Sequence, residues 1–177
     1  MRKLLLVATC VALMAPALAH AAGTEDSDDT PGRLDIEYVG AHIEGDRDVF
    51  EIEMFRAWSN RLVRERGHIA ALFNTKKDAR AEWKLEMVFR RGRWTGEVCG
   101  HRGGRGARET IRPVCHRARV WRSEATSIEF SIRPDQILKD ADTSYTWRAK
   151  TKLRFAKGCA GTGREYCIDA SLGKQAD

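Results

Sequence analysis

Apolar and polar residues alternate along most of the chain beyond residue 33, a period typical of β-strands with one buried face. Residues 34–39 alternate apolar and acidic side chains, and residues 49–55 do so again after a turn at 44–48. The two segments predict an antiparallel hairpin. Further strands are expected at 68–74, 81–89, 94–99, 117–123 and 127–132.

The longest alternating segment covers residues 145–155, where aromatic and aliphatic side chains occupy one face and basic side chains the other. Helical periodicity is weak throughout: residues 56–66 could form a helix, and residues 134–139 a single turn after Pro134. Short strands separated by turn signals favour an all-β protein. We predict a single antiparallel β-sandwich of about eight strands.

The first 21 residues have the pattern of a cleaved secretory signal. Arg2 and Lys3 precede an apolar run from 4 to 18, and Ala19 and Ala21 provide a small-x-small cleavage site, with 17–19 as the alternative. Residues 22–33 are small, acidic and turn-rich, which predicts a flexible leader. The folded domain is expected at 34–177, in a protein that is secreted or periplasmic.

The composition is that of a globular protein, with 42% hydrophobic and 32% charged residues. Charges interrupt every apolar run after the signal, so we expect no membrane span in the mature chain. Cys10 is a poor lipid-anchor site because too little apolar sequence precedes it.

Four cysteines remain after cleavage, and an even number in an exported chain predicts disulfides. Three pairings are possible, and local pairing is favoured because each bridge then closes one glycine-rich loop. The expected bridges are Cys99–Cys115 and Cys159–Cys167. Zinc is the competing interpretation, but the chain has no C-x-x-C spacing and its histidines are scattered. No metal or cofactor is expected.

The loop at 74–82 has the alternate spacing of a calcium loop, with Asn74, Asp78 and Glu82 as oxygen donors. Lys76 and Arg80 place cations where carboxylates would be needed, so a turn with exposed charges is expected instead. This loop resembles an Asp-Thr-Asp-Gly-Asp segment of uncharacterised exported β-sandwich domains of bacteria.

Three other stretches share that resemblance: residues 34–36, residues 144–149, and the closing segment from Cys159 to Asp169. These domains are similar in layout to carbohydrate-binding and heme-binding sandwich modules. The resemblance implies a fold and no particular activity.

Arginines crowd residues 90–122 in a chain of net charge +6, of which Arg2 and Lys3 leave with the signal. With the basic row at 148–154 they are expected to form one positive face, on which arginine side chains can bind anionic groups. The candidate ligand-binding residues are Arg91, Arg93, Arg102, Arg105, Arg122, Arg148 and Lys150. The alternative is that these residues merely solubilise the surface. The predicted partner is an anionic polysaccharide or cell-envelope polymer, and intracellular nucleic acid is not expected.

Five tryptophans are candidates for stacking on sugar rings. Trp83 and Trp147 lie on the apolar faces of their predicted strands, so we assign them to the core. Trp121, between basic residues, is the best candidate for an exposed platform, and Trp94 at a turn exit is the second. Packing in the core or at its edge is the alternative for each of them.

Catalytic motifs are absent: there is no Gly-x-Ser-x-Gly elbow and no phosphate-binding glycine loop. We therefore predict an exported, non-catalytic binding or structural module. One alternative is a carbohydrate-binding module that uses exposed tryptophans. Another is a small secreted hydrolase assembled from distant residues, whose candidate side chains are Glu51, Glu53, Asp78, His68 and His116.

Overall fold

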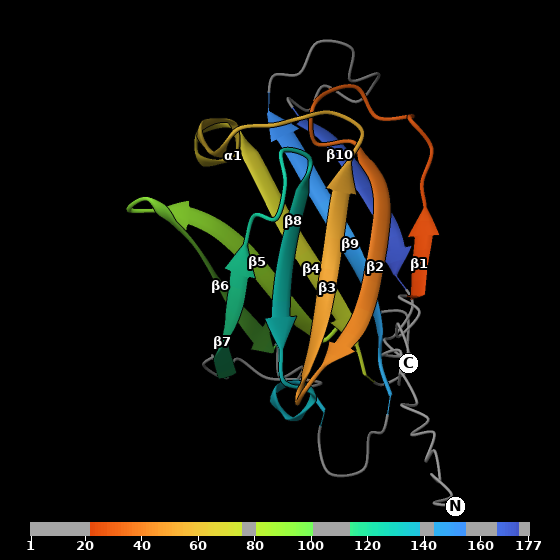
Figure 1. The fold of residues 1–177 in the computed structure, drawn as a ribbon, viewed down its shortest axis with the longest axis vertical. Coiled ribbons are helices and arrows are strands. Elements are labelled where there is room, and N and C mark those ends of the chain that lie inside the picture. The colour runs from red at the N-terminus through yellow and green to blue at the C-terminus, as the bar shows by residue number, and fades with distance from the viewer. Residues whose placement is uncertain (1–21, 76–80, 101–113, 139–143, 155–165, 174–177) are drawn as a thin grey trace, which may run out of the picture.

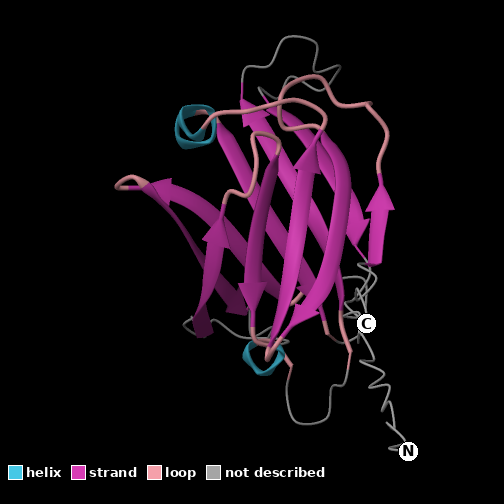
Figure 2. Cartoon of the chain, viewed as in Figure 1, coloured by secondary structure: helices cyan, strands magenta, loops and turns pink. Residues whose placement is uncertain are grey.

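The computed structural model describes residues 22–75, 81–100, 114–138, 144–154 and 166–173. These residues form an all-β fold with one short helix and one 3-10 turn (Figures 1 and 2). The strands are β1 (Ala22–Glu25), β2 (Ile36–Glu44), β3 (Arg47–Met54), β4 (Gly67–Asn74), β5 (Trp83–Arg90), β6 (Arg93–Gly100), β7 (Val114–Trp121), β8 (Ser127–Ile132), β9 (Thr146–Arg154) and β10 (Tyr166–Gly173). Helix α1 (Asn60–Glu65) lies between β3 and β4, and the 3-10 turn (Pro134–Gln136) follows β8.

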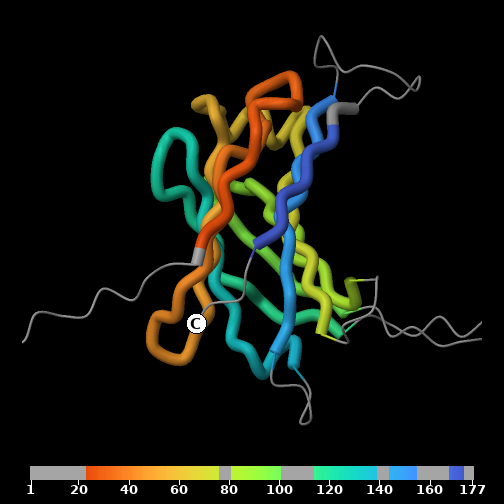
Figure 3. The backbone as a smooth tube through the Cα atoms, turned by 90° about the vertical axis from the view of Figure 1, so that its right-hand side faces the viewer, coloured from red at the N-terminus to blue at the C-terminus, as the bar shows by residue number. Residues whose placement is uncertain are grey.

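The ten strands of the described residues belong to one antiparallel sheet in the order β1-β2-β3-β8-β7-β6-β5-β4-β9-β10. The sheet curls until its two ends meet, with the first strands beside β10 in Figure 3. Side chains bridge this seam: Asp169 on β10 accepts a hydrogen bond from the Ile36 amide at 2.6 Å. Thr151 on β9 donates to the Leu34 carbonyl. The result is a nearly closed barrel.

The all-β prediction is confirmed, whereas the predicted sandwich of eight strands is not. Alternation shows that each strand buries one face, but it does not show whether that face meets a second sheet or the far side of the same one. The sequence also missed β1, which lies in the predicted leader and pairs with β2 from Ala22 opposite Ala41. Its four residues, AGTE, carry no alternation to reveal them.

The weakly predicted helix is present in shortened form as α1. Ser59 caps its N-terminus, where the Ser59 hydroxyl accepts a hydrogen bond from the Leu62 amide at 3.1 Å. Val63 is the buried residue of the helix, which packs against β4 and β5 near the end of the sheet (Figure 1).

An aromatic cluster fills the middle of the barrel interior, with Phe50 at its centre. The Phe50 ring stacks on Phe130 at 4.8 Å between centroids and 11° between planes. It also meets the edges of Trp147 at 4.9 Å and Phe73 at 5.5 Å. All four side chains are at most 1% exposed. Trp147 is therefore a core residue, as the sequence predicts.

Candidate anion-binding groove

A groove of about 810 Å³ opens where β6 and β7 stop pairing with each other. The two strands pair from Gly100 and Val114 as far as Gly96 and Ala118. Beyond that point β6 continues in the hairpin with β5, while β7 turns to pair with β8 through Arg119–Trp121. Figure 1 shows the β5–β6 hairpin projecting away from the remainder of the sheet. The groove occupies this fork and the adjoining outer surface of β5 to β7.

Basic side chains outnumber acidic ones by five to two along the walls of the groove. The basic residues are Lys84, Arg90, Arg93, Arg117 and Arg119, and the acidic residues are Glu86 and Glu97. Trp121 completes the wall on β7, where it is half-buried. The groove therefore combines an excess of positive charge with one flat aromatic surface, a combination suited to an anionic ligand with an apolar ring face.

The sheet register places the basic row of β9 on the same outer face as the groove. Arg148 on β9 lies opposite Leu72, which in turn lies opposite Lys84. Directly opposed residues of antiparallel strands point to the same side of the sheet. Lys84 in turn lies opposite Cys99 on β6, whose neighbour in the same register is Cys115 on β7. The two arginine- and lysine-rich segments singled out in the sequence thus share one surface, with β4 and β5 between them.

The cations on this face influence one another. Burial lowers the pKa of Lys150, and the neighbouring charges of Lys152, Arg148 and Lys84 lower it further. Burial likewise lowers the pKa of His68. Glu86 raises this pKa, and the charges of Lys84, Lys152 and Lys150 lower it. An anion bound nearby would relieve this mutual repulsion.

One ion pair lies along the β5 wall of the groove. Lys84 donates a hydrogen bond to Glu86, and this contact holds the pKa of Glu86 below its usual range. Both side chains remain partly exposed, at 36% and 51%. Exposed pairs of this kind stabilise a protein by under about 1 kcal/mol, so a ligand anion can compete with Glu86 for Lys84.

The candidate ligand residues of the sequence occupy several positions. Arg93 lines the groove, and Arg91 sits at the tip of the β5–β6 hairpin with φ 51°, next to Gly92 at φ 77°. Successive positive φ values are typical of a two-residue hairpin turn. Arg148 and Lys150 belong to the row on β9. Arg102 and Arg105 lie outside the described residues.

Arg122 is occupied by contacts within the protein. Its guanidinium lies 4.2 Å from the centroid of the Trp58 ring and donates hydrogen bonds to the carbonyls of Trp58 and Ala125. Its Nε donates to the Glu124 carbonyl at 2.8 Å. Arg122 does not line the groove. These contacts favour a structural role, fastening the turn after β7 to the segment that precedes α1.

Arg122→Ala should lower the free energy of unfolding by about 1.5–3 kcal/mol, because a charged donor to three carbonyls is lost. Its affinity for an anionic polymer should stay at the wild-type value. Urea denaturation and a binding titration of the same variant check both statements. Arg64→Ala, which removes an exposed arginine of α1, is the control and should change stability by less than about 0.5 kcal/mol. A loss of affinity without a loss of stability would instead assign Arg122 to the ligand.

The tryptophans divide between the groove and the core. Trp94 lines the groove but packs against Trp58 at 5.6 Å and Phe89 at 5.4 Å between ring centroids. Trp83 is half-buried and packs on the edge of the core. Trp121 is therefore the platform that the geometry favours.

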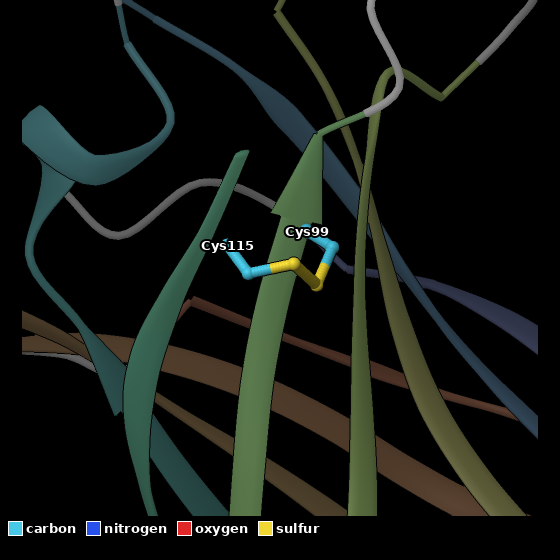
Figure 4. Close-up of a disulfide and its surroundings, with 2 residues drawn as sticks. All are labelled: Cys99 and Cys115. Atoms are coloured by element: carbon cyan, nitrogen blue, oxygen red, sulfur yellow. A yellow bond between two sulfur atoms is a disulfide. The ribbon is translucent and has the colours of Figure 1, made fainter. Parts of the chain in front are cut away.

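A disulfide joins β6 to β7 at the end of their ladder opposite the fork (Figure 4). Cys99 and Cys115 face each other with 4.1 Å between their Cα atoms. This prediction is confirmed. For the second predicted bridge, Cys159 and the side chain of Cys167 lie outside what the structure describes.

Sequence reasoning did not single out Lys84, although its outward position follows from the alternation of β5. No pattern in the sequence predicts the fork, because it arises where β7 changes its pairing partner from β6 to β8. The predicted loop at 74–82 is only partly described: the Thr75 amide donates to the Glu82 carboxylate at 2.9 Å.

The carboxylates proposed for a hydrolase do not line this groove. Glu51 and Glu53 lie on the outer face of β3, where burial, Glu129 and Glu53 raise the pKa of Glu51. His68 and His116 are likewise not among the groove residues, and Asp78 lies outside the described part of the chain.

Comparison of the chain with family models, curated proteins and solved structures finds no match. The resemblance to exported β-sandwich domains thus stays a prediction. Within the described ranges, no helix has the length and apolar character needed to cross a membrane.

Proposed function

We propose that this protein is an exported, non-catalytic binding module that holds an anionic polysaccharide or cell-envelope polymer in the groove between β6 and β7. The observation that carries the proposal is the lining of that groove, which holds five basic side chains and Trp121 against two carboxylates. The predicted signal at residues 1–21 supports export. The Cys99–Cys115 disulfide is compatible with an oxidising compartment.

The arrangement on β7 suits a ligand with repeated charges. Arg117 and Arg119 alternate with core-facing residues, so their side chains project from the same face roughly 7 Å apart along the strand. Each guanidinium can make two parallel hydrogen bonds to a carboxylate or sulfate group. Trp121, one step further along the same face, offers its ring to the apolar side of a sugar.

The basic row on β9 extends the same surface. Four strand spacings separate β7 from β9 in the sheet, roughly 19 Å in total. A polymer longer than this distance can therefore contact Arg117 and Arg148 at once. Several weak contacts along one chain raise its overall affinity, and salt weakens all of them.

The double variant Arg117→Gln and Arg119→Gln should bind heparin, used as a model anionic polysaccharide, about tenfold more weakly than the wild type. Isothermal titration at moderate salt gives the affinity. The matched control is Arg61→Gln with Arg64→Gln, which removes the same charge from exposed positions of α1 and should leave the affinity unchanged.

Two outcomes would contradict this proposal. Equal loss of affinity in the groove variant and the α1 variant would mean that heparin responds to net charge alone. A loss confined to Trp121→Ala, with binding indifferent to salt, would instead identify a carbohydrate-binding module that relies on stacking.

A further inference from the structure

Three aspartates meet where the barrel closes, on the side of the molecule away from the fork. Asp29 and Asp35 belong to the connection between β1 and β2, and Asp169 belongs to β10. One carboxylate oxygen from each lies within 4.8 Å of the other two. Figure 3 shows the segments that carry them, at the beginning and end of the described chain, running side by side.

One oxygen of this cluster is buried without a hydrogen-bond donor. Asp35 is 2% exposed, and among the described residues no donor reaches its Oδ2. Its other oxygen accepts from the Thr30 amide at 3.2 Å. The side chain that approaches Asp35 is Asp28, another carboxylate, which has no proton to give when ionised. A buried acceptor of this kind is rare unless a proton or a cation compensates it.

The cluster is also short of positive charge. Further carboxylates lie close to it, Asp28 beside Asp35 and Asp26 near Asp169.

Two arginines lie near this connection, but both have other partners. Arg56 pairs with Asp28 at 3.7 Å, in a contact where both side chains are more than half exposed. Arg33 donates to the Ala57 carbonyl at 2.9 Å. Among the described residues, neither forms a hydrogen bond or an ion pair with Asp35 or Asp169.

We propose that Asp29, Asp35 and Asp169 bind a calcium ion that ties the connection between β1 and β2 to β10. The donor set consists of hard carboxylate oxygens, which Ca²⁺ prefers. Calcium–oxygen distances of about 2.3–2.6 Å place opposed ligands roughly 4.6–5.2 Å apart, so oxygens that all lie within 4.8 Å of one another can share one ion. Magnesium binds less readily to such a site, because it demands near-ideal octahedral geometry at about 2.0–2.1 Å and loses its water reluctantly.

Hydrogen bonds from two backbone amides hold the Asp169 carboxylate in place. Asp169 accepts hydrogen bonds from the amides of Ile36 at 2.6 Å and Ala170 at 2.7 Å, which fix the orientation of its carboxylate. These bonds leave lone pairs on both oxygens for a cation. A bound ion would join residues from the two ends of the sheet and would therefore add to the hydrogen bonds that close the barrel.

The test is calorimetric titration of the chelator-treated protein with CaCl₂ and with MgCl₂, together with the melting temperature in each salt. We expect one Ca²⁺ per chain, a higher melting temperature in CaCl₂, and at least about tenfold weaker binding of Mg²⁺. Asp35→Asn and Asp29→Asn should each weaken calcium binding by about tenfold or more. Asp46→Asn, at the exposed turn between β2 and β3, should bind like the wild type.

Asp29 is exposed, so its variant keeps the test valid even if a change at Asp35 prevents folding. The proposal is overturned if the wild type shows neither binding heat nor a thermal shift with CaCl₂. It is equally overturned if Asp29→Asn binds calcium as tightly as the wild type, or if magnesium binds as tightly as calcium.

Discussion

Phe50→Ala should lower the free energy of unfolding by about 3–5 kcal/mol, the largest effect that we expect of any single substitution. Phe50 is fully buried and lies against four other aromatic rings, of which Phe73, Phe130 and Trp147 belong to β4, β8 and β9. Removing its ring leaves a cavity at the centre of the barrel, and neighbours held on three strands cannot all collapse into it. Part of the loss also comes from the ring–ring contacts themselves.

Urea denaturation followed by tryptophan fluorescence measures this loss. Ile43→Ala is the control, because Ile43 is 47% exposed on β2 and its removal should cost less than about 0.5 kcal/mol. A cost below about 1 kcal/mol for Phe50→Ala would mean that the interior is not packed around this ring, and would contradict the fold described above.

The double variant Cys99→Ala and Cys115→Ala should lose about 3 kcal/mol of stability, the second largest effect. The bridge closes a loop between residues 16 apart in sequence, and cutting it returns conformational freedom to the unfolded chain. The bridge also fixes β6 beside β7 at one end of the groove, so we expect heparin affinity to fall with stability.

Denaturation with and without dithiothreitol distinguishes the contribution of this disulfide to stability from that of any other disulfide. The wild type should lose more stability on reduction than the double variant does, because the variant has already lost the Cys99–Cys115 contribution. Equal sensitivity to reduction in both proteins would show that Cys99 and Cys115 do not form the stabilising bridge.

Alternation in the sequence was sufficient to locate most of the strands. The pattern at 145–155 predicted β9 and buried Trp147, as observed. It could not distinguish a sandwich from a barrel, because closure depends on contacts between distant segments. The hydrogen bond from the Ile36 amide to the Asp169 carboxylate joins residues 133 positions apart, and no local periodicity predicts it.

The site was predictable only in part, for the same reason. Basic composition pointed to Arg93 and Trp121, which do line the groove. Composition alone could not distinguish these residues from Arg122, whose partner Trp58 is 64 positions away in sequence. The sequence did not predict the aspartate cluster, because Asp169 comes close to Asp29 and Asp35 only when β10 lies beside β1 and β2.

The most direct test of the proposed function is to locate bound ligand by NMR. Amide chemical shifts of ¹⁵N-labelled protein are recorded during titration with a heparin-derived hexasaccharide. The proposal predicts that the largest changes fall in residues 84–99 and 114–121, and that they shrink in the Arg117→Gln, Arg119→Gln variant. Changes concentrated in β2, β3 or α1, or a pattern that the double variant leaves unaltered, would contradict it.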